Sequence, residues 1–384
     1  MRKNDLRNIA IIAHVDHGKT TLVDGLLRQS GTFKEHQDID DRVMDSMDLE
    51  KERGITITAK NTAISYNNIK INILDTPGHA DFGGEVERSL NLVDGALLLV
   101  DASEGPLPQT RFVLKKTLEK DLPIIVVINK IDRSDARIDD VIEEVYDLFI
   151  DLDASDDQIE FPIVYSNAKV GIAKTDPEEN SNDLKPLFDC ILDKIPGPVA
   201  NDDQLPQFLI TNLDYDPYVG QIAIGRLHSG LLQMNKLYSL CTSDEKRCNQ
   251  KFSALYTFRG LEKVKVDKVV SGDIIAFAGL DNISIGDTIS DNERPDSLPR
   301  IQVDSPTVSM MFHVNDSPFS GKDGKYLTTR HLSERLILET YSNVSLEVIQ
   351  TERSDVFEVR GRGELQLAIL IETMRREGYE FIVS

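Results

Sequence analysis

The sequence has few cysteines, no long apolar run and an excess of acidic over basic residues, and each feature excludes a class of protein. Its 384 residues include three cysteines, Cys190, Cys241 and Cys248, and none stands in a C-x-x-C pair. An odd, dispersed set of cysteines does not form a disulfide framework, so we expect a reduced, cytoplasmic protein. No stretch approaches the roughly 18 apolar residues that cross a bilayer, so we expect no membrane partner. The start, MRKNDLRNIAIIAHV, has no small-residue cleavage site and is interpreted as a first strand.

The charge balance excludes a general nucleic-acid-binding protein. Lys and Arg number 43 against 65 Asp and Glu, which gives a formal net charge of −22 at pH 7. This is the opposite of a basic footprint, so we expect no DNA partner. RNA contact through a local basic patch stays compatible with this composition, and the candidate residues are Arg360, Arg362, Arg375 and Arg376.

The first part of the chain predicts an open α/β sheet. Near-continuous runs of Ile, Val and Leu alternate with helical stretches such as TTLVDGLLRQSG and DDVIEEVYDLFIDL. Such alternation is typical of a mainly parallel sheet covered by helices. Asn67–Asn68 lies between two runs and predicts a hairpin that adds an antiparallel edge. The expected strands are 8–13, 69–75, 95–101, 123–129 and 161–166.

Two further units are expected after this sheet. KIPGPVAN, residues 194–201, indicates a boundary, because two prolines flank a glycine and the pattern changes after it. Short β-rich runs from Asp202 to about Arg300 predict a small β-barrel. From near Pro306 the order strand, helix, strand, strand, helix, strand predicts a ferredoxin-like α+β unit. The predicted domains are 1–198, 199–303 and 304–384.

AHVDHGKTT, Ala13 to Thr21, follows a predicted strand and precedes a predicted helix, which is the setting of a phosphate-binding loop. Backbone N–H groups at the helix start and the helix dipole attract an anion there. Gly18 allows close approach, Lys19 is expected to bridge the outer phosphates, and the Thr20 hydroxyl to hold Mg²⁺. The generic motif begins with glycine rather than alanine, and the alternative is a strand-to-helix turn with a solvated lysine. The nucleotide-binding candidates are Asp16, His17, Gly18, Lys19, Thr20 and Thr21.

Two more motifs supply candidates for the metal and the terminal phosphate. In LDTPGHADF, Asp75 ends a predicted strand and is placed to hold Mg²⁺ through water, while the Gly78 N–H is placed to bind the terminal phosphate. In RGITI, the Thr56 hydroxyl is expected to complete the Mg²⁺ shell only when the terminal phosphate is present. The alternatives are a Pro-Gly turn with a capping aspartate and an ordinary β-branched strand.

NKID, residues 129–132, follows the run PIIVVI and selects the base. A buried Asp132 carboxylate accepts from both N1–H and the exocyclic amine of guanine, whereas adenine offers no such pair of donors. Asn129 is expected to brace the loop, and the stem of Lys130 to lie over the base. In SNAKVG, which follows the next run, the Ala168 N–H is expected to donate to guanine O6. The remaining nucleotide-binding candidates are Gly78, Asn129, Lys130, Ile131, Asp132, Asn167, Ala168 and Lys169.

The ordered set AHVDHGKT, RGITI, DTPGH, NKID and NAK resembles the GTPase domain of translation factors, and the alanine at position 13 matches the subgroup similar to elongation factor G. The segments GGEVER and EGPLPQTRFV are similar to those of the BipA/TypA family and separate the chain from elongation factor G and LepA. The resemblance implies a P-loop GTPase domain, a β-barrel and a ferredoxin-like domain over the whole chain. Asn167 stands where the family usually has serine. Family members continue with two further domains, so we expect an N-terminal part of a longer protein.

The resemblance also implies the catalytic residue. His79 follows Gly78 at the place where small GTPases carry a water-orienting glutamine, and a histidine can donate to a phosphate oxygen while ordering water. Val15 and Ile55 are implied as a hydrophobic gate between His79 and the nucleotide. We expect residues 33–58 to be a switch ordered by GTP–Mg²⁺ and released after hydrolysis. Unstimulated turnover of about 10⁻⁴ s⁻¹ is expected, with a gain of up to roughly 10⁵-fold from an activator.

The expected function is a monomeric, ribosome-associated GTPase that uses GTP, releases GDP and phosphate, and needs Mg²⁺. The resemblance implies contacts with ribosomal RNA and proteins through local patches, and roles in the stress response and in large ribosomal subunit assembly. One alternative is a GTP-gated ribosome-binding module in which hydrolysis is only a reset. Another is a translation factor similar to elongation factor G or LepA. RGRGELQ offers a G-x-G pair as a second nucleotide site, but a helix start packed near a strand accounts for it.

Overall fold

The structure is a computed structural model that describes residues 1–31, 48–216, 218–301, 304–318, 320–343 and 345–384. Its first unit is built on a seven-stranded sheet in the order β2-β3-β1-β4-β5-β6-β7. The strands are β1 (Leu6–Ala13), β2 (Lys60–Tyr66), β3 (Ile69–Asp75), β4 (Gly95–Asp101), β5 (Ile124–Asn129), β6 (Ile163–Asn167) and β7 (Ile172–Lys174). β1 and β3 to β6 run parallel, as their continuous apolar runs predict.

The predicted hairpin is confirmed at one edge of this sheet. β2 pairs antiparallel with β3, and both Asn67 and Asn68 have positive φ angles, 50° and 63°. Left-handed conformations at both central residues match the twist of a two-residue hairpin, and asparagine tolerates them. At the opposite edge β7 pairs antiparallel with β6, a strand that the sequence did not predict.

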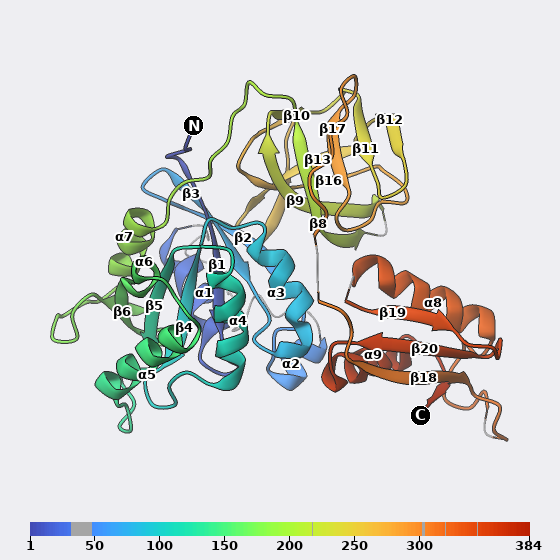
Figure 1. Ribbon diagram of the computed structural model, residues 1–384, viewed down its shortest axis with the longest axis horizontal. Coiled ribbons are helices and arrows are strands. Elements are labelled where there is room, and N and C mark those ends of the chain that lie inside the picture. Colours follow the sequence, from blue (N-terminus) through green and yellow to red (C-terminus); the bar gives the residue numbers. More distant parts are fainter. Residues whose placement is uncertain (32–47, 217, 302–303, 319, 344) are drawn as a thin grey trace.

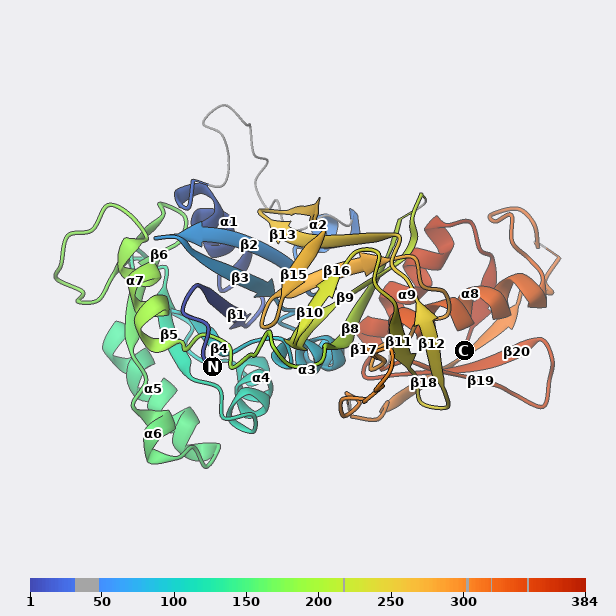
Figure 2. The ribbon, with the colours of Figure 1, turned by 90° about the horizontal axis from the view of Figure 1, so that it is seen from above.

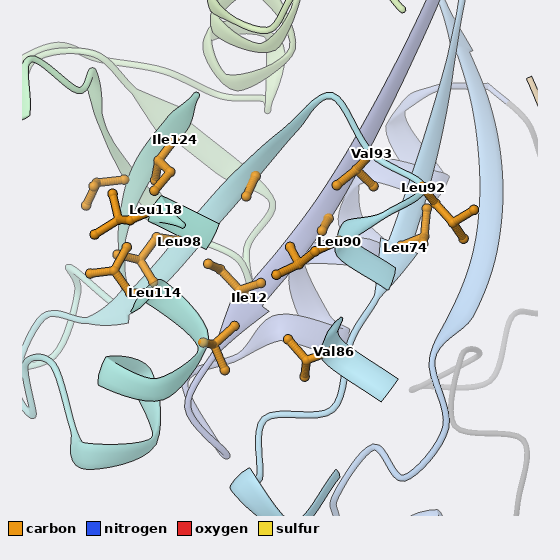
Figure 3. Close-up of a cluster of buried hydrophobic side chains, with 14 of the residues drawn as sticks. Ile12, Leu74, Val86, Leu90, Leu92, Val93, Leu98, Leu114, Leu118 and Ile124 are labelled. Carbon is orange, nitrogen blue, oxygen red and sulfur yellow. The ribbon is translucent and has the colours of Figure 1, made fainter. Parts of the chain in front are cut away.

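Helices cover both faces of the sheet (Figure 1). The helices described in this unit are α1 (Lys19–Gln29), α2 (Asp48–Arg53), α3 (Gly83–Leu90), α4 (Pro108–Leu118), α5 (Ile138–Asp151), α6 (Asp156–Ile159) and α7 (Lys185–Lys194), with a short 3₁₀ helix η1 (Ala80–Phe82). On one face, Leu98 lies beside Leu114 of α4, and Ile12 lies between Leu98 and Val86 of α3 in the same buried cluster (Figure 3). On the other, Leu97 packs with Leu22 of α1 and Phe188 of α7. This two-sided burial holds the strand ends rigidly where the motifs begin.

The second unit is antiparallel throughout. Eight strands form one sheet in the order β12-β11-β17-β8-β9-β16-β13-β14, and β10 pairs with β15. The bounds are β8 (Gln207–Asp216), β9 (Gly220–Ser229), β10 (Leu231–Gln233), β11 (Tyr238–Cys241), β12 (Lys246–Gln250), β13 (Ala254–Arg259), β14 (Glu262–Lys265), β15 (Lys268–Val270), β16 (Ile274–Ala278) and β17 (Thr288–Asp291). The unit is joined to the first by two backbone hydrogen bonds between Ala63 and Gly260 and by an ion pair of Arg226 with Asp94 at 2.8 Å.

The third unit has the predicted ferredoxin-like order. Its elements are β18 (Val308–Val314), α8 (Thr329–Ser342), β19 (Glu347–Gln350), β20 (Val356–Gly361), α9 (Glu364–Arg376) and β21 (Phe381–Val383), with the sheet order β19-β20-β18-β21. The first and third units lie at opposite ends of the molecule's long axis, and the barrel lies over the place where they meet (Figure 1, Figure 2). The domain limits 1–198, 199–303 and 304–384 stay a prediction.

The arginines expected to form a basic patch are engaged within the chain. Arg360 pairs with Glu358 at 2.8 Å, Arg362 with Asp304 at 3.3 Å, and Arg376 with Glu52 at 2.6 Å. Arg375 lies over the ring of Phe381. Three of the four arginines are therefore paired with carboxylates, and contact with ribosomal RNA through this region stays a prediction. Within the described part of the chain, no helix combines the length and the apolar character that membrane crossing requires.

Candidate nucleotide-binding site

The loop between β1 and α1 lies at the carboxyl ends of the parallel strands. Gly18 precedes the helix with a φ of 95°, a region that glycine adopts without strain. A side chain there would also come within 2.5 Å of Asn129 Nδ2. Gly18 offers no side-chain cap to the first turn of α1, so the N–H groups of that turn are open to an anion.

The Pro77–Gly78 turn packs directly on this loop. A Cβ at Gly78 would lie 2.7 Å from the carbonyl oxygen of Ala13 and 3.2 Å from the backbone nitrogen of Val15. Main-chain atoms cannot rotate out of the way as a side chain does. The close approach of the two segments therefore requires glycine at position 78.

A cluster of polar side chains gathers below the loop. The Lys19 ammonium donates to the Thr56 hydroxyl at 3.0 Å and forms an ion pair with Asp75. Asp75 is fully buried at the end of β3, and its Oδ2 has no hydrogen-bond partner among the described residues. A buried carboxylate oxygen without a partner is costly, and a cation bound beside it would remove that cost.

These residues fit a magnesium ion. Thr56 and Asp75 approach the same ammonium group, and Thr20, the third candidate ligand, lines the adjacent cavity. In the residues that the structure describes, no group of three or more His, Cys, Asp or Glu side chains is arranged to hold a metal. The donor set is therefore one carboxylate with hydroxyls, which suits an ion that keeps waters and phosphate oxygens as its other ligands.

Asn129 braces the loops around the cavity, as predicted for it. The side chain is buried, its Nδ2 donates to the His17 carbonyl at 2.8 Å, and its Oδ1 accepts from the Ala168 N–H at 3.0 Å. The amide thus joins the phosphate loop to the loop after β6. The Ala168 N–H expected to reach guanine O6 already has a partner, so contact with a base requires it to be shared or released.

Lys130 is anchored by a residue that the sequence analysis missed. Its ammonium group lies 2.7 Å from Asp101 Oδ2 and donates to the Asp16 carbonyl at 2.7 Å. Burial raises the pKa of Asp101, but hydrogen bonds from Lys130 and Ser103 outweigh burial and hold the pKa at about 2. The carboxylate is therefore charged, and it fixes the end of the lysine whose stem is expected to lie over the base. The position of Asp101 at the end of β4 was the available signal.

The base end of the site is open. Asp132 is exposed rather than buried, and within the described residues its carboxylate has no hydrogen bond or ion pair to another side chain. Asn167, which stands in for the usual serine, accepts from the Val170 N–H at 3.2 Å and so shapes the neighbouring loop. A free carboxylate beside a shaped loop is suited to accepting two donors from a purine.

His79 lies at the edge of the site. It precedes η1, and its Nδ1 is 3.2 Å from both the backbone nitrogen and Oδ1 of Asp81. Val15 and Ile55, the expected gate, line the cavity, whereas His79 is not among its described lining residues. Of the expected switch, residues 33–47 lie outside the described residues, and 48–53 form α2.

A cavity of about 660 Å³ connects most of the predicted residues. Its size suits a nucleotide-sized ligand. His17 lies beneath the loop rather than in the wall, and burial lowers its pKa to about 4. Ile131 and Asp75 do not line the cavity either. The predicted residues that do are Val15, Asp16, Gly18, Lys19, Thr20, Thr21, Ile55, Thr56, Gly78, Asn129, Lys130, Asp132, Asn167, Ala168 and Lys169. Lining residues that the sequence analysis missed include Asp24, Arg28, Gln29 and Arg133.

Comparison with known families agrees with the predicted order of units. Residues 4–197 match the family described as elongation factor Tu GTP binding domain, and residues 207–292 match elongation factor G domain 2. A crystal structure of a protein from Thermus thermophilus superposes with a TM-score of 0.74 at 19% sequence identity, covering 100% of this chain and 67% of that chain. The predicted fold class, a GTPase domain followed by a β-barrel and an α+β unit, is confirmed.

Similar proteins share more than the fold. The chain is 52% identical over 382 residues to the large ribosomal subunit assembly factor BipA of Bacillus subtilis (strain 168), covering 100% of this chain and 62% of the relative. It is 54% identical over 379 residues to the large ribosomal subunit assembly factor BipA of Escherichia coli (strain K12), covering 99% of this chain and 62% of the relative. It is 52% identical over 383 residues to the putative elongation factor TypA-like SVR3, chloroplastic, of Arabidopsis thaliana, covering 100% of this chain and 57% of the relative. The chain thus spans less than two thirds of these relatives.

Proposed function

The chain belongs to the BipA/TypA family of translational GTPases, and from that premise we propose that it binds GTP and hydrolyses it to GDP and phosphate. The observation that carries this proposal is the convergence of five motifs on one cavity. At one end the Asp132 carboxylate is free for a base. At the other, Lys19 and Asp75 gather charge where a triphosphate and its metal would lie.

Binding would rearrange the charges at the phosphate end. The Lys19 ammonium would leave Asp75 for the outer phosphates, while N–H groups of Gly18 and the first turn of α1 donate to phosphate oxygens. Thr20, Thr56 and Asp75 would then hold Mg²⁺, which neutralises charge on the phosphate oxygens when it is bound. Phosphoryl transfer to water depends mainly on such positioning and charge stabilisation, and this chain's residues supply both.

His79 is proposed to orient the attacking water and to donate to a phosphate oxygen. Its ring faces Asp81 rather than the cavity, so hydrolysis requires the ring to turn toward the nucleotide past Val15 and Ile55. This requirement is consistent with slow unstimulated turnover and with stimulation by a partner that favours the turned ring.

The partner proposed is the ribosome. Two of the similar proteins are named large ribosomal subunit assembly factors, which supports a role for this chain in the same process. We extend this to a monomeric cytoplasmic protein active in the stress response. A GTP-gated binding module shares every residue of the site, and it differs only in needing hydrolysis as a reset. If a non-hydrolysable GTP analogue fully supports the cellular task, that second candidate is the correct one.

Three measurements test the proposal. Calorimetry is expected to give micromolar or tighter binding of GTP and at least about 100-fold weaker binding of ATP, because a site built for guanine donors rejects a base that lacks them. Ribosome-stimulated turnover is expected to fall by about 100-fold or more in Thr56→Ala and His79→Ala. Co-sedimentation with ribosomes is expected with the analogue and not with GDP. ATP binding as tight as GTP binding, or normal turnover of His79→Ala on ribosomes, contradicts the proposal.

A further inference from the structure

The orientation of His79 depends on its neighbour Asp81. The backbone nitrogen and Oδ1 of Asp81 each lie 3.2 Å from His79 Nδ1. An unprotonated Nδ1 accepts from the N–H, and a protonated Nδ1 donates to the carboxylate, so Asp81 offers this atom a partner in both protonation states. The ring is therefore held against η1, and the described lining of the cavity includes Gly78 but not His79.

Asp81 is in turn held by the third unit. Its other carboxylate oxygen, Oδ2, accepts from the Leu365 N–H at 2.8 Å, although the two residues are 284 positions apart. Leu365 lies in the first turn of α9, and the preceding Gly363 has no side chain with which to cap that helix. N–H groups at a helix start lack partners within the helix and carry partial positive charge, so they favour a carboxylate. The Asp81 side chain thus caps a helix of another unit.

Gly363 leaves the room for this contact. Its φ of −165° is extended backbone that any residue adopts, so the conformation itself does not require glycine. A Cβ at this position would instead collide with the Asp81 carboxylate group. The second glycine of the G-x-G pair in RGRGELQ therefore has a specific use in the fold, which is to admit a side chain from the first unit to the start of α9.

α9 also contacts the segment that leads to Thr56. At its other end Arg376 forms a two-pronged ion pair with Glu52 of α2, at 2.9 and 2.6 Å. A small buried cluster joins the same elements: Leu49, Ile57, Phe82 and Ile369. α9 thus lies against both segments that flank the phosphate end of the site (Figure 1).

We propose that the third unit restrains His79 through Asp81, in an autoinhibitory contact that keeps unstimulated hydrolysis slow. The proposal rests on the proposed function, because a restraint on His79 matters only if His79 acts on GTP. A partner that separates α9 from η1 frees Asp81 and then the histidine ring, so movement of the third unit becomes the signal for hydrolysis. Both side chains are partly exposed, 28% and 18%, so their contact is weak enough for a partner to break.

The test measures unstimulated turnover and GTP affinity of the full chain in three variants. Asp81→Ala removes the contact from the first unit, and Gly363→Ala displaces the carboxylate from the side of the third unit. Each is expected to raise unstimulated turnover at least about threefold, because the His79 ring is more often turned toward the nucleotide. The GTP dissociation constant is expected to stay unchanged. The matched control is Glu364→Ala, an exposed carboxylate in the same turn of α9, and it is expected to leave turnover unchanged. Damage to the fold lowers turnover, so it cannot imitate a rise.

Further variants link the effect to His79. In a His79→Ala background, Asp81→Ala is expected to leave unstimulated turnover unchanged, because both substitutions act on the same step, the orientation of water by His79. Unchanged or reduced turnover in both Asp81→Ala and Gly363→Ala, or a rise that persists without His79, overturns the restraint. NMR signals of the His79 ring and amide exchange at Leu365 read the contact without nucleotide. If the parent protein hydrolyses no GTP, the proposed function fails, but these two signals still decide whether Asp81 holds His79 and the Leu365 N–H. Changed signals in both Asp81→Ala and Gly363→Ala support that contact, and unchanged spectra reject it.

Discussion

The ammonium group of Lys19 is paired with the carboxylate of Asp75 in the interior of the first unit. Both side chains are almost inaccessible to solvent, with 8% and 0% exposed. Each charge therefore depends on the other for compensation, since water is excluded from both. The pair brings a phosphate-binding residue and a metal-binding candidate into contact, so changes to either should affect stability and nucleotide binding in separable ways.

Asp75→Ala is expected to lower the free energy of unfolding by about 3 kcal/mol, because it leaves the buried Lys19 ammonium without the carboxylate that compensates its charge, and the neutral Thr56 hydroxyl does not replace it. The double variant Lys19→Met, Asp75→Leu removes both charges and is expected to recover most of that loss, while GTP binding stays abolished. Urea unfolding and calorimetry on the same samples separate the two effects. Asp75→Ala with the stability of the parent protein would contradict this account of the pair.

Asp132→Asn is expected to change the preferred base from guanine to xanthine. The asparagine amide can donate to the xanthine 2-oxygen, whereas it loses the charged acceptor for the guanine amine. GTP affinity should fall by about 10- to 100-fold, and xanthosine triphosphate should bind in its place. Competition against a fluorescent nucleotide measures both. Asp135→Asn, in an exposed aspartate of the same loop that pairs with Arg133, should change neither affinity.

Much of the first unit follows from local patterns. Buried parallel strands appear as continuous apolar runs, and the turn at Asn67–Asn68 is set by the two residues themselves, so both were predictable. β7 was missed because its three residues are too short to establish a period. The ordered motifs gave most of the cavity wall in the same way, because four of the five lie at the end of a strand whose position the sheet fixes; RGITI instead lies between α2 and β2.

Contacts between distant segments were not predictable. Asp101 looks like an ordinary strand end, and only the folded structure brings it to Lys130. The expectation that Asp132 is buried treated the loop as closed over a base, whereas the protein alone leaves the carboxylate exposed. Nothing in the sequence near Asp81 indicates the N–H of Leu365 as its partner, because that pairing depends on how the third unit docks.

His228 is expected to make stability depend on pH. Burial lowers its pKa to about 4, and its Nε2 has no hydrogen-bond partner among the described residues. Between about pH 6.5 and 4 the unfolded chain binds more protons than the folded one, so stability is complete above that window and is lost as the pH falls through it. The loss attributable to this ring approaches about 3 kcal/mol at the acid end.

His228→Leu should therefore reduce the slope of unfolding free energy against pH in that window. The slope should not vanish, because burial also lowers the pKa of His17 to about 4. Urea unfolding at half-unit steps from pH 7.5 to 4.5 measures both proteins. Equal slopes for the variant and the parent would show that the ring is not held neutral by burial.

Gly78→Ala is expected to weaken GTP binding and Gly25→Ala to leave it unchanged, although both glycines line the same cavity. At Gly78 a Cβ would meet the Ala13 carbonyl oxygen at 2.7 Å, and this main-chain atom can retreat only if the phosphate loop moves. GTP affinity should fall at least about tenfold, because displacing the loop by a fraction of an ångström weakens several hydrogen bonds to phosphate at once.

At Gly25, inside α1, a Cβ would approach Leu184 Cδ1 at 3.1 Å, the end of a side chain that can adjust. Alanine is also the better helix former by up to about 1 kcal/mol, so Gly25→Ala should keep the affinity and match or raise the stability of the parent. Calorimetry and thermal unfolding of the two variants test both halves. Equal losses of affinity would mean that general crowding of the cavity, rather than contact between the two backbones, requires these glycines.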